Sequence, residues 1–172
     1  MGRVDRWRFC PRCAAELGHS FERVECPACG FITHSNSEPT ACALVVDADG
    51  RLLLVRRAHD PHGGTWDLPG GFLEEAEHPL DALRRELREE TGLDVEPVEF
   101  VGIRLDRYGD GHDAPTTLNL YWTARVTGGE PEAGDDAAEL RWFAPDDLPP
   151  DDQIGFAGVR EVLRVWRGAC GT

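Results

Sequence analysis

Four cysteines near the N-terminus have the spacing of a metal site. They form two pairs, Cys10-Pro-Arg-Cys13 and Cys26-Pro-Ala-Cys29. A two-residue gap lets a tight turn direct both sulfurs of a pair at one ion, and zinc prefers four tetrahedral sulfur ligands. Two disulfides are the alternative, and they are disfavoured in a cytoplasmic protein. Four protein ligands leave no open coordination position, so we predict a structural Zn²⁺ site formed by Cys10, Cys13, Cys26 and Cys29.

A second group of side chains able to do chemistry is a set of glutamates. A helix over Pro79–Thr91 would place Glu86, Glu89 and Glu90 within an arc of about 100°, beside a stripe of leucines. Carboxylates at these spacings repel one another, so they need a counter-ion. Arginine or a divalent cation would serve, and a set of oxygen ligands favours Mg²⁺ or Mn²⁺ over Zn²⁺. A solvated acidic face is the alternative.

The residues around these glutamates resemble the Nudix box. Gly71, five residues, Glu77, seven residues and then Arg85–Leu93 match its pattern at every specified position. With the flanking segments, the resemblance covers about residues 40–167. It implies an α/β fold, namely an α/β/α sandwich around a mixed sheet.

The resemblance also implies roles for the matching residues. Glu86, Glu89 and Glu90 would bind the divalent metal, and one of them would help to deprotonate water. Arg85 would orient these carboxylates, and Glu77 would support the site.

Two further roles follow from the same resemblance. Gly71 matches a glycine whose backbone lets the loop fold tightly against the helix. Glu139 resembles a downstream acid that in some members is a further metal ligand or a base. Three other acids compete for that role: Asp113, Asp135 and Asp136.

The implied activity is Mg²⁺- or Mn²⁺-dependent hydrolysis of a nucleoside diphosphate linked to another moiety. All 18 basic residues are arginines, so chemistry that needs a lysine is excluded. A four-cysteine zinc ribbon followed by a Nudix domain resembles the arrangement in NADH pyrophosphatases. Those enzymes carry a further segment rich in Ser, Gln, Pro, Trp and Phe after the Nudix box, and residues 116–122 lack such a segment. ADP-ribose-like compounds, NAD(H) and related nucleotides therefore stay open as substrates. The alternative function is a non-catalytic ligand sensor whose ribbon binds protein or RNA.

Composition limits the partners. The net charge of −14 argues against a non-specific binder of nucleic acid or of an anionic membrane. The N-terminus lacks the apolar core of a signal peptide, and no apolar run approaches the ~20 residues of a membrane span. We expect a cytoplasmic protein that acts on a small nucleotide, and a homodimer is a further expectation.

The predicted elements must bring these residues together. We expect a zinc ribbon over residues 1–38 and a Nudix domain over residues 39–172. A helix is predicted over residues 79–91, where Pro79 lies in the first turn and Gly92 follows the end, and a closing helix around residues 156–166. Strands are predicted at residues 41–46, 52–55, 66–68, 100–105, 118–126 and 140–143.

Overall fold

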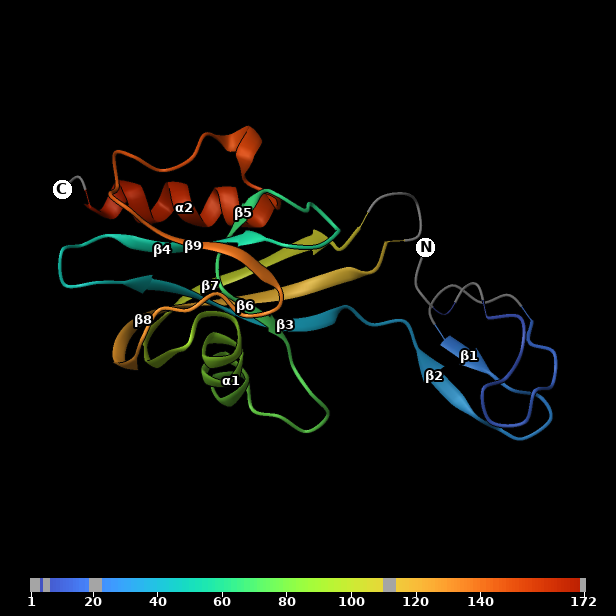
Figure 1. Cartoon of the computed structure of the whole chain (residues 1–172). Coiled ribbons are helices and arrows are strands. Elements are labelled where there is room, and N and C mark those ends of the chain that lie inside the picture. Colours follow the sequence, from blue (N-terminus) through green and yellow to red (C-terminus); the bar gives the residue numbers. More distant parts are fainter. Residues whose placement is uncertain (1–3, 5–6, 19–22, 110–113, 171–172) are drawn as a thin grey trace. The chain divides into compact units, whose positions relative to one another are not determined.

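A computed structural model of the chain describes residue 4 and residues 7–18, 23–109 and 114–170. Asp113, one of the candidate downstream acids, lies outside these residues. The chain forms two compact units, one of residues 1–38 with 107–117 and one of residues 39–106 with 118–172 (Figure 1). Among the described residues, no helix is long and apolar enough to cross a membrane.

The smaller unit has a two-stranded antiparallel sheet and a very small core. Strands β1 (Arg23–Glu25) and β2 (Ile32–His34) pair so that Val24 lies opposite Thr33. Among the described residues of this unit, the buried cluster contains five, two of them cysteines, and partly buried side chains such as Trp7 and Phe31 pack against it. The five are Val4, Cys10, Leu17, Val24 and Cys26. A core this small needs a metal or another cross-link to be stable.

The larger unit is a mixed sheet between two helices, which confirms the predicted fold class. Its main path runs in the order β5-β4-β3-β8-β7, with β6 paired to β3 and β9 paired to β4. Helices α1 (Pro79–Thr91) and α2 (Ala157–Cys170) lie on opposite sides of the strands (Figure 1). A short 3-10 helix, Asp151–Gln153, precedes α2. The strands are β3 (Glu38–Val46), β4 (Leu52–Arg57), β5 (Trp66–Asp67), β6 (Gly70–Phe72), β7 (Leu93–Arg107), β8 (Thr116–Gly129) and β9 (Ala137–Phe143).

Local signals set both ends of α1, as predicted. At the start, Nδ1 of His78 accepts a hydrogen bond from the Leu80 N–H, and Pro79 occupies the first turn. At the end, Gly92 adopts a left-handed φ of 69° and its N–H donates to the carbonyl of Arg88. The leucine stripe faces the sheet: Leu83 and Leu87 are fully buried.

A side chain from the sheet holds the start of α2. Oδ1 of Asp106 accepts from the Gly158 N–H at 3.0 Å, and Oδ2 accepts from Nδ2 of Asn119 at 3.0 Å. Oδ1 of Asn119 in turn accepts from the Thr40 hydroxyl at 2.7 Å. This buried chain of hydrogen bonds links β3, β8 and β7 to the helix, and it satisfies helix N–H groups that otherwise lack a partner.

Several strand boundaries differ from the expected ones. Strands β7 and β8 extend well beyond the predicted ranges, because long hairpin partners continue the ladder past the apolar residues. Gly70 and Gly71, predicted to end a strand, belong to the separate strand β6 and pair with Cys42 and Ala41. Glu139, predicted to precede a strand, lies inside β9.

Candidate functional site

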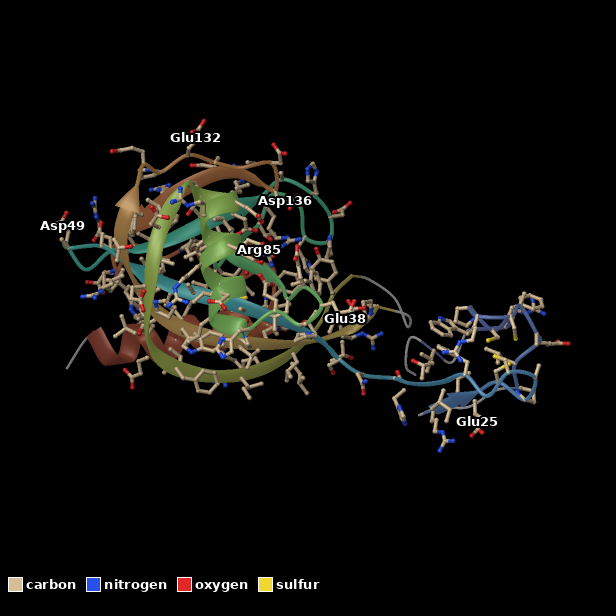
Figure 2. All side chains as sticks on the ribbon, turned by 90° about the horizontal axis from the view of Figure 1, so that it is seen from below. Glu25, Glu38, Asp49, Arg85, Glu132 and Asp136 are labelled. Atoms are coloured by element: carbon tan, nitrogen blue, oxygen red, sulfur yellow. The ribbon has the colours of Figure 1, made fainter. Side chains whose placement is uncertain are left out.

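Arg85, which Figure 2 labels on α1, makes hydrogen bonds with three glutamates. Its Nε and Nη2 donate to the two carboxylate oxygens of Glu77, each at 2.8 Å. Its Nη1 donates to Glu86 at 2.8 Å and to Glu89 at 3.1 Å, and Nη2 also donates to the carbonyl of Phe72 at 3.1 Å. A planar guanidinium offers five donors in a fixed geometry, so one side chain holds three carboxylates and the loop before the helix.

Glu90 is a half-buried acid near the end of α1. Its Oε2 accepts from the Gly70 N–H at 2.9 Å, which ties the end of α1 to the start of β6. Burial raises the pKa of Glu90 to about 8, although the Gly70 N–H acts in the opposite direction. Burial also raises the pKa of Glu86. Two acids of the same helix edge are thus desolvated in a way that disfavours their negative charge.

Two glycines allow the loop to approach this edge. A Cβ at Gly70 would lie 2.2 Å from the carbonyl oxygen of Ala41, and the φ of Gly70 is 144°. A Cβ at Gly71 would lie 2.4 Å from the carboxylate carbon of Glu86. Any other residue at position 71 would displace Glu86, in line with the role that the sequence resemblance implies for this glycine.

The glutamates offer oxygen ligands but do not converge. Among the described residues, only the four cysteines bring three or more candidate ligand atoms within 4.8 Å of one another. Glu86 and Glu89 instead face Arg85, and Glu90 faces Gly70. The donor set nevertheless suits Mg²⁺ or Mn²⁺, because a bound cation would offset both the burial and the neighbouring carboxylates that raise the pKa of Glu90. To bind one ion together, Glu86 and Glu89 would have to rotate away from Arg85, and Glu90 away from the Gly70 N–H.

The candidate downstream acids occupy different positions. Glu139 lies opposite Arg56 on the neighbouring strand, and the two exposed side chains form an ion pair at 3.6 Å. Asp136 interacts electrostatically with the cluster, because its negative charge contributes to the raised pKa of Glu90. The Asp136 carbonyl accepts from the Ala58 N–H at 3.0 Å, which holds this part of the chain against the end of β4.

Asp67 lies near the site and is not among the residues predicted from the sequence. Asp67 is buried, Arg57 contacts it at 3.3 Å, and burial raises its pKa to about 6. Its charge also contributes to the raised pKa of Glu90. The available signal was an aspartate flanked by Trp66 and Leu68, because an acid between large apolar residues is expected to be buried.

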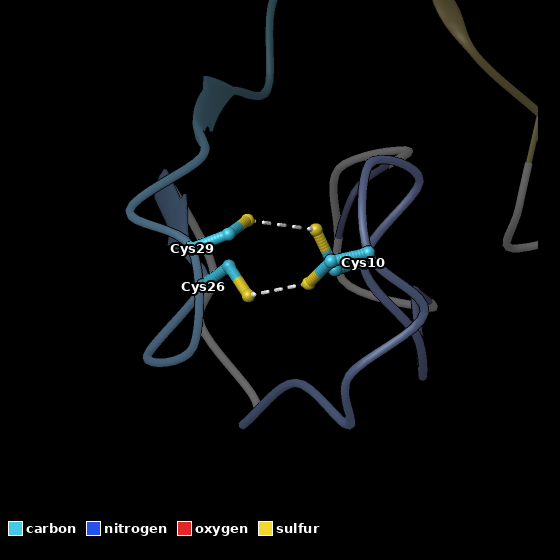
Figure 3. Close-up of side chains that lie close together, drawn as sticks. Cys10, Cys26 and Cys29 are labelled. Carbon is cyan, nitrogen blue, oxygen red and sulfur yellow. Dashed lines mark hydrogen bonds between the residues drawn. The ribbon is translucent and has the colours of Figure 1, made fainter.

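The cysteine cluster has the geometry of a four-sulfur metal site (Figure 3). Sγ of Cys10 lies 3.7 Å from Sγ of Cys29, and Sγ of Cys13 lies 3.6 Å from Sγ of Cys26. Zinc–sulfur bonds of about 2.3 Å in a tetrahedron separate the sulfurs by about 3.8 Å. All four cysteines are free thiols. These spacings therefore favour a Zn²⁺ site over two disulfides.

We expect replacement of Glu77 by glutamine to flatten the acid dependence of stability. The hydrogen bonds from Arg85 lower the pKa of Glu77 to about 2, from an ordinary value of 4.5. An acid with a lowered pKa in the folded state stabilises the protein above its unfolded pKa, and this contribution is lost as the pH falls through the folded pKa. Urea denaturation between pH 7 and pH 3 should therefore show a smaller loss for Glu77→Gln than for the parent. Glu75→Gln, at an exposed neighbouring acid, should follow the parent, and parallel curves for Glu77→Gln and the parent would contradict the assignment.

The chain is similar in sequence to proteins of one known family. The family model described as NUDIX domain matches residues 36–163. An ADP-ribose pyrophosphatase of Methanocaldococcus jannaschii is 36% identical over 107 residues, which is 61% of each chain. The NAD-capped RNA hydrolase NudC of Stutzerimonas stutzeri is 32% identical over 152 residues, or 85% of this chain and 51% of the relative. The chain thus spans about half to three-fifths of the length of these curated relatives.

Solved structures show the same fold. The crystal structure of a NUDIX hydrolase from Nitrosomonas europaea superposes with a TM-score of 0.78 at 25% identity, and the match covers 94% of this chain and 91% of that one. The NUDIX domain of Shewanella oneidensis NrtR, solved with ADP ribose, superposes with a TM-score of 0.61 at 20% identity over 78% of this chain and 89% of that one. The second likeness concerns the fold alone.

Proposed function

Because the chain belongs to the Nudix family, we propose that it is a Mg²⁺- or Mn²⁺-dependent pyrophosphohydrolase. Its substrate would be a nucleoside diphosphate linked to another moiety, such as ADP-ribose, NAD(H) or a related nucleotide. The observation that carries the proposal is the gathering of Glu86, Glu89 and Glu77 around Arg85, beside the half-buried Glu90. These four carboxylates carry more negative charge than the single guanidinium of Arg85 balances, so a divalent cation would stabilise the cluster.

In this proposal the helix edge holds the cation and the arginine orients its ligands. Glu86, Glu89 and Glu90 would be the metal ligands, and Glu77 would keep Arg85 in place. Bound there, Mg²⁺ would neutralise the charge of a diphosphate and make a water molecule more acidic. One of the glutamates would accept the proton from that water, and the P–O–P linkage would break without a covalent intermediate.

We further propose Asp136 in preference to Glu139 as the downstream acid. The charge of Asp136 acts on Glu90, and its backbone is fixed by Ala58. Glu139 is instead ion-paired with Arg56, and both side chains are exposed.

The zinc ribbon is proposed as a structural module. Residues 1–38 would fold around Zn²⁺ held by the four cysteines, and residues 39–172 would form the hydrolase domain. The cytoplasmic location, the homodimer and the expectation that nucleic acid is not a partner stay predictions from the sequence.

A substrate panel tests the function. The zinc-loaded protein is incubated with Mg²⁺ and each of ADP-ribose, NADH, diadenosine polyphosphates and nucleoside triphosphates, and the products are separated by chromatography. We expect AMP and ribose 5-phosphate from ADP-ribose, because hydrolysis of the diphosphate yields two monophosphates. A folded protein that binds ADP-ribose but cleaves none of these compounds would instead support the alternative function, a non-catalytic ligand sensor.

A further inference from the structure

The loop of residues 130–136 closes over the C-terminal end of α1. The N–H of Glu132 donates to the carbonyl of Thr91 at 2.9 Å, and the N–H of Gly134 donates to the carbonyl of Glu90 at 2.9 Å. Figure 2 labels Glu132 and Asp136 at two points of this loop. The last carbonyls of a helix have no partner within it, so the loop supplies hydrogen bonds at the turn that carries the candidate metal ligands.

The loop approaches the helix too closely for a side chain. A Cβ at Gly134 would lie 2.1 Å from the carbonyl oxygen of Glu89 and 3.1 Å from Cα of Glu90. On the other side of the contact, a Cβ at Gly92 would lie 2.5 Å from the carbonyl oxygen of Glu130. Backbone therefore packs directly on backbone, and glycine is needed on both surfaces.

The far end of the loop is tied to the sheet. The N–H of Ala58, just after β4, donates to the carbonyl of Asp136 at 3.0 Å, and the N–H of Ala137 donates to the carbonyl of Gly134 at 3.1 Å. Strand β9 then continues along β4. The end of α1 is thus connected through a short, fixed segment to the central strands.

Helix α1 would end at Thr91 without this contact to the loop. Gly92 already terminates α1 with its own hydrogen bond to Arg88, and Leu83 and Leu87 already anchor the helix on the sheet. The contact with the loop adds a fixed position for the last turn, where Glu89 and Glu90 lie. Metal ligands must be held within about 0.5 Å of their productive geometry, so the position of this turn affects metal affinity directly.

We propose that the loop of residues 130–136 is a positioning element for the carboxylates of Glu89 and Glu90, and that Gly134 is its key positioning residue. A side chain at position 134 would displace the last turn of α1, and with it the Glu90 carboxylate that accepts from the Gly70 N–H. The inference rests on the proposed function, because it assigns Glu89 and Glu90 to the metal.

The test is the variant Gly134→Ala, measured on the zinc-loaded protein. Binding of Mn²⁺ to the free protein is followed by electron paramagnetic resonance, and the Mg²⁺ concentration for half-maximal hydrolysis is determined separately. We expect the dissociation constant for Mn²⁺ and the Mg²⁺ concentration for half-maximal hydrolysis to increase about tenfold each. This is the lower end of the effect of residues that orient metal ligands. Glu132→Pro, which removes the other N–H donor to the helix without placing a Cβ at position 134, should shift them in the same direction.

Gly158→Ala is the matched control. A Cβ at Gly158 would lie 2.3 Å from Oδ2 of Asp106 and 2.9 Å from Cβ of Arg104, so this variant introduces a comparable clash at the start of α2. We expect both Gly158→Ala and Gly134→Ala to lower the melting temperature. In Gly158→Ala, however, the Mn²⁺ dissociation constant and the Mg²⁺ concentration for half-maximal hydrolysis should stay at the parent values. Parent-like metal constants in a folded Gly134→Ala protein, or equal shifts in both variants, would overturn the inference. A parent protein that binds Mn²⁺ in a Gly134-dependent manner but hydrolyses no nucleotide would overturn the proposed function and support the positioning role.

Discussion

Glu90→Gln should abolish hydrolysis and leave the protein at least as stable as the parent. A bound cation lowers a reaction barrier by several kcal/mol, so loss of a ligand should reduce kcat by about 10³-fold or more. The amide oxygen can still accept from the Gly70 N–H, and the buried charge is gone. Because burial raises the pKa of Glu90 to about 8, the parent must hold either a proton or a desolvated charge at neutral pH, whereas glutamine requires neither. Turnover with Mg²⁺ and urea denaturation without Mg²⁺ measure the two effects.

Two further variants sharpen this prediction. Glu89→Gln should also lose hydrolysis with little change in stability, because its carboxylate is largely exposed and is one of the repelling charges. Glu99→Gln makes the same chemical change at an exposed acid of β7 and should keep the turnover of the parent. Normal turnover in Glu90→Gln or Glu89→Gln would show that the metal ligands are assigned wrongly.

Loss of Zn²⁺ should unfold the cysteine-rich module and leave the larger unit intact. The cluster of five buried residues includes two of the four metal ligands, so little apolar surface remains to hold residues 7–34 together. Structural zinc sites contribute about 10–16 kcal/mol in isolated zinc-finger peptides, more than a core of this size can replace. We expect one Zn²⁺ per chain by elemental analysis of the parent. In Cys26→Ser we expect no stoichiometric zinc and a loss of amide chemical-shift dispersion confined to this module.

Cys42→Ser is the control for this experiment. Cys42 lies on β3 of the larger unit, outside the four-cysteine cluster, so its replacement should leave the zinc content unchanged. A parent protein without zinc whose residues 7–34 are nevertheless ordered would contradict the assignment of the cluster.

Short-range patterns in the sequence were sufficient to predict the limits of α1 and the protein family. Helix α1 was predicted with its observed limits, because its start at Pro79 and its end before Gly92 depend on residues within one turn. The cysteine pairs were recognisable for the same reason, since each pair needs only a tight turn. The family followed from a pattern of 23 residues, Gly71–Leu93, which places its glutamates on one helix edge.

The tertiary structure decided which distant groups meet these residues. Glu90 contacts Gly70 across 20 positions, the loop of residues 130–136 closes on the end of α1, and Asp106 holds Gly158 at the start of α2 across 52 positions. Such contacts depend on strand order and register, which side-chain periodicity does not encode: period two tells which face a residue occupies but not which strand lies beside it. For that reason the sequence supplied the candidate ligands, whereas their burial and their link to Arg85 depended on the folded chain.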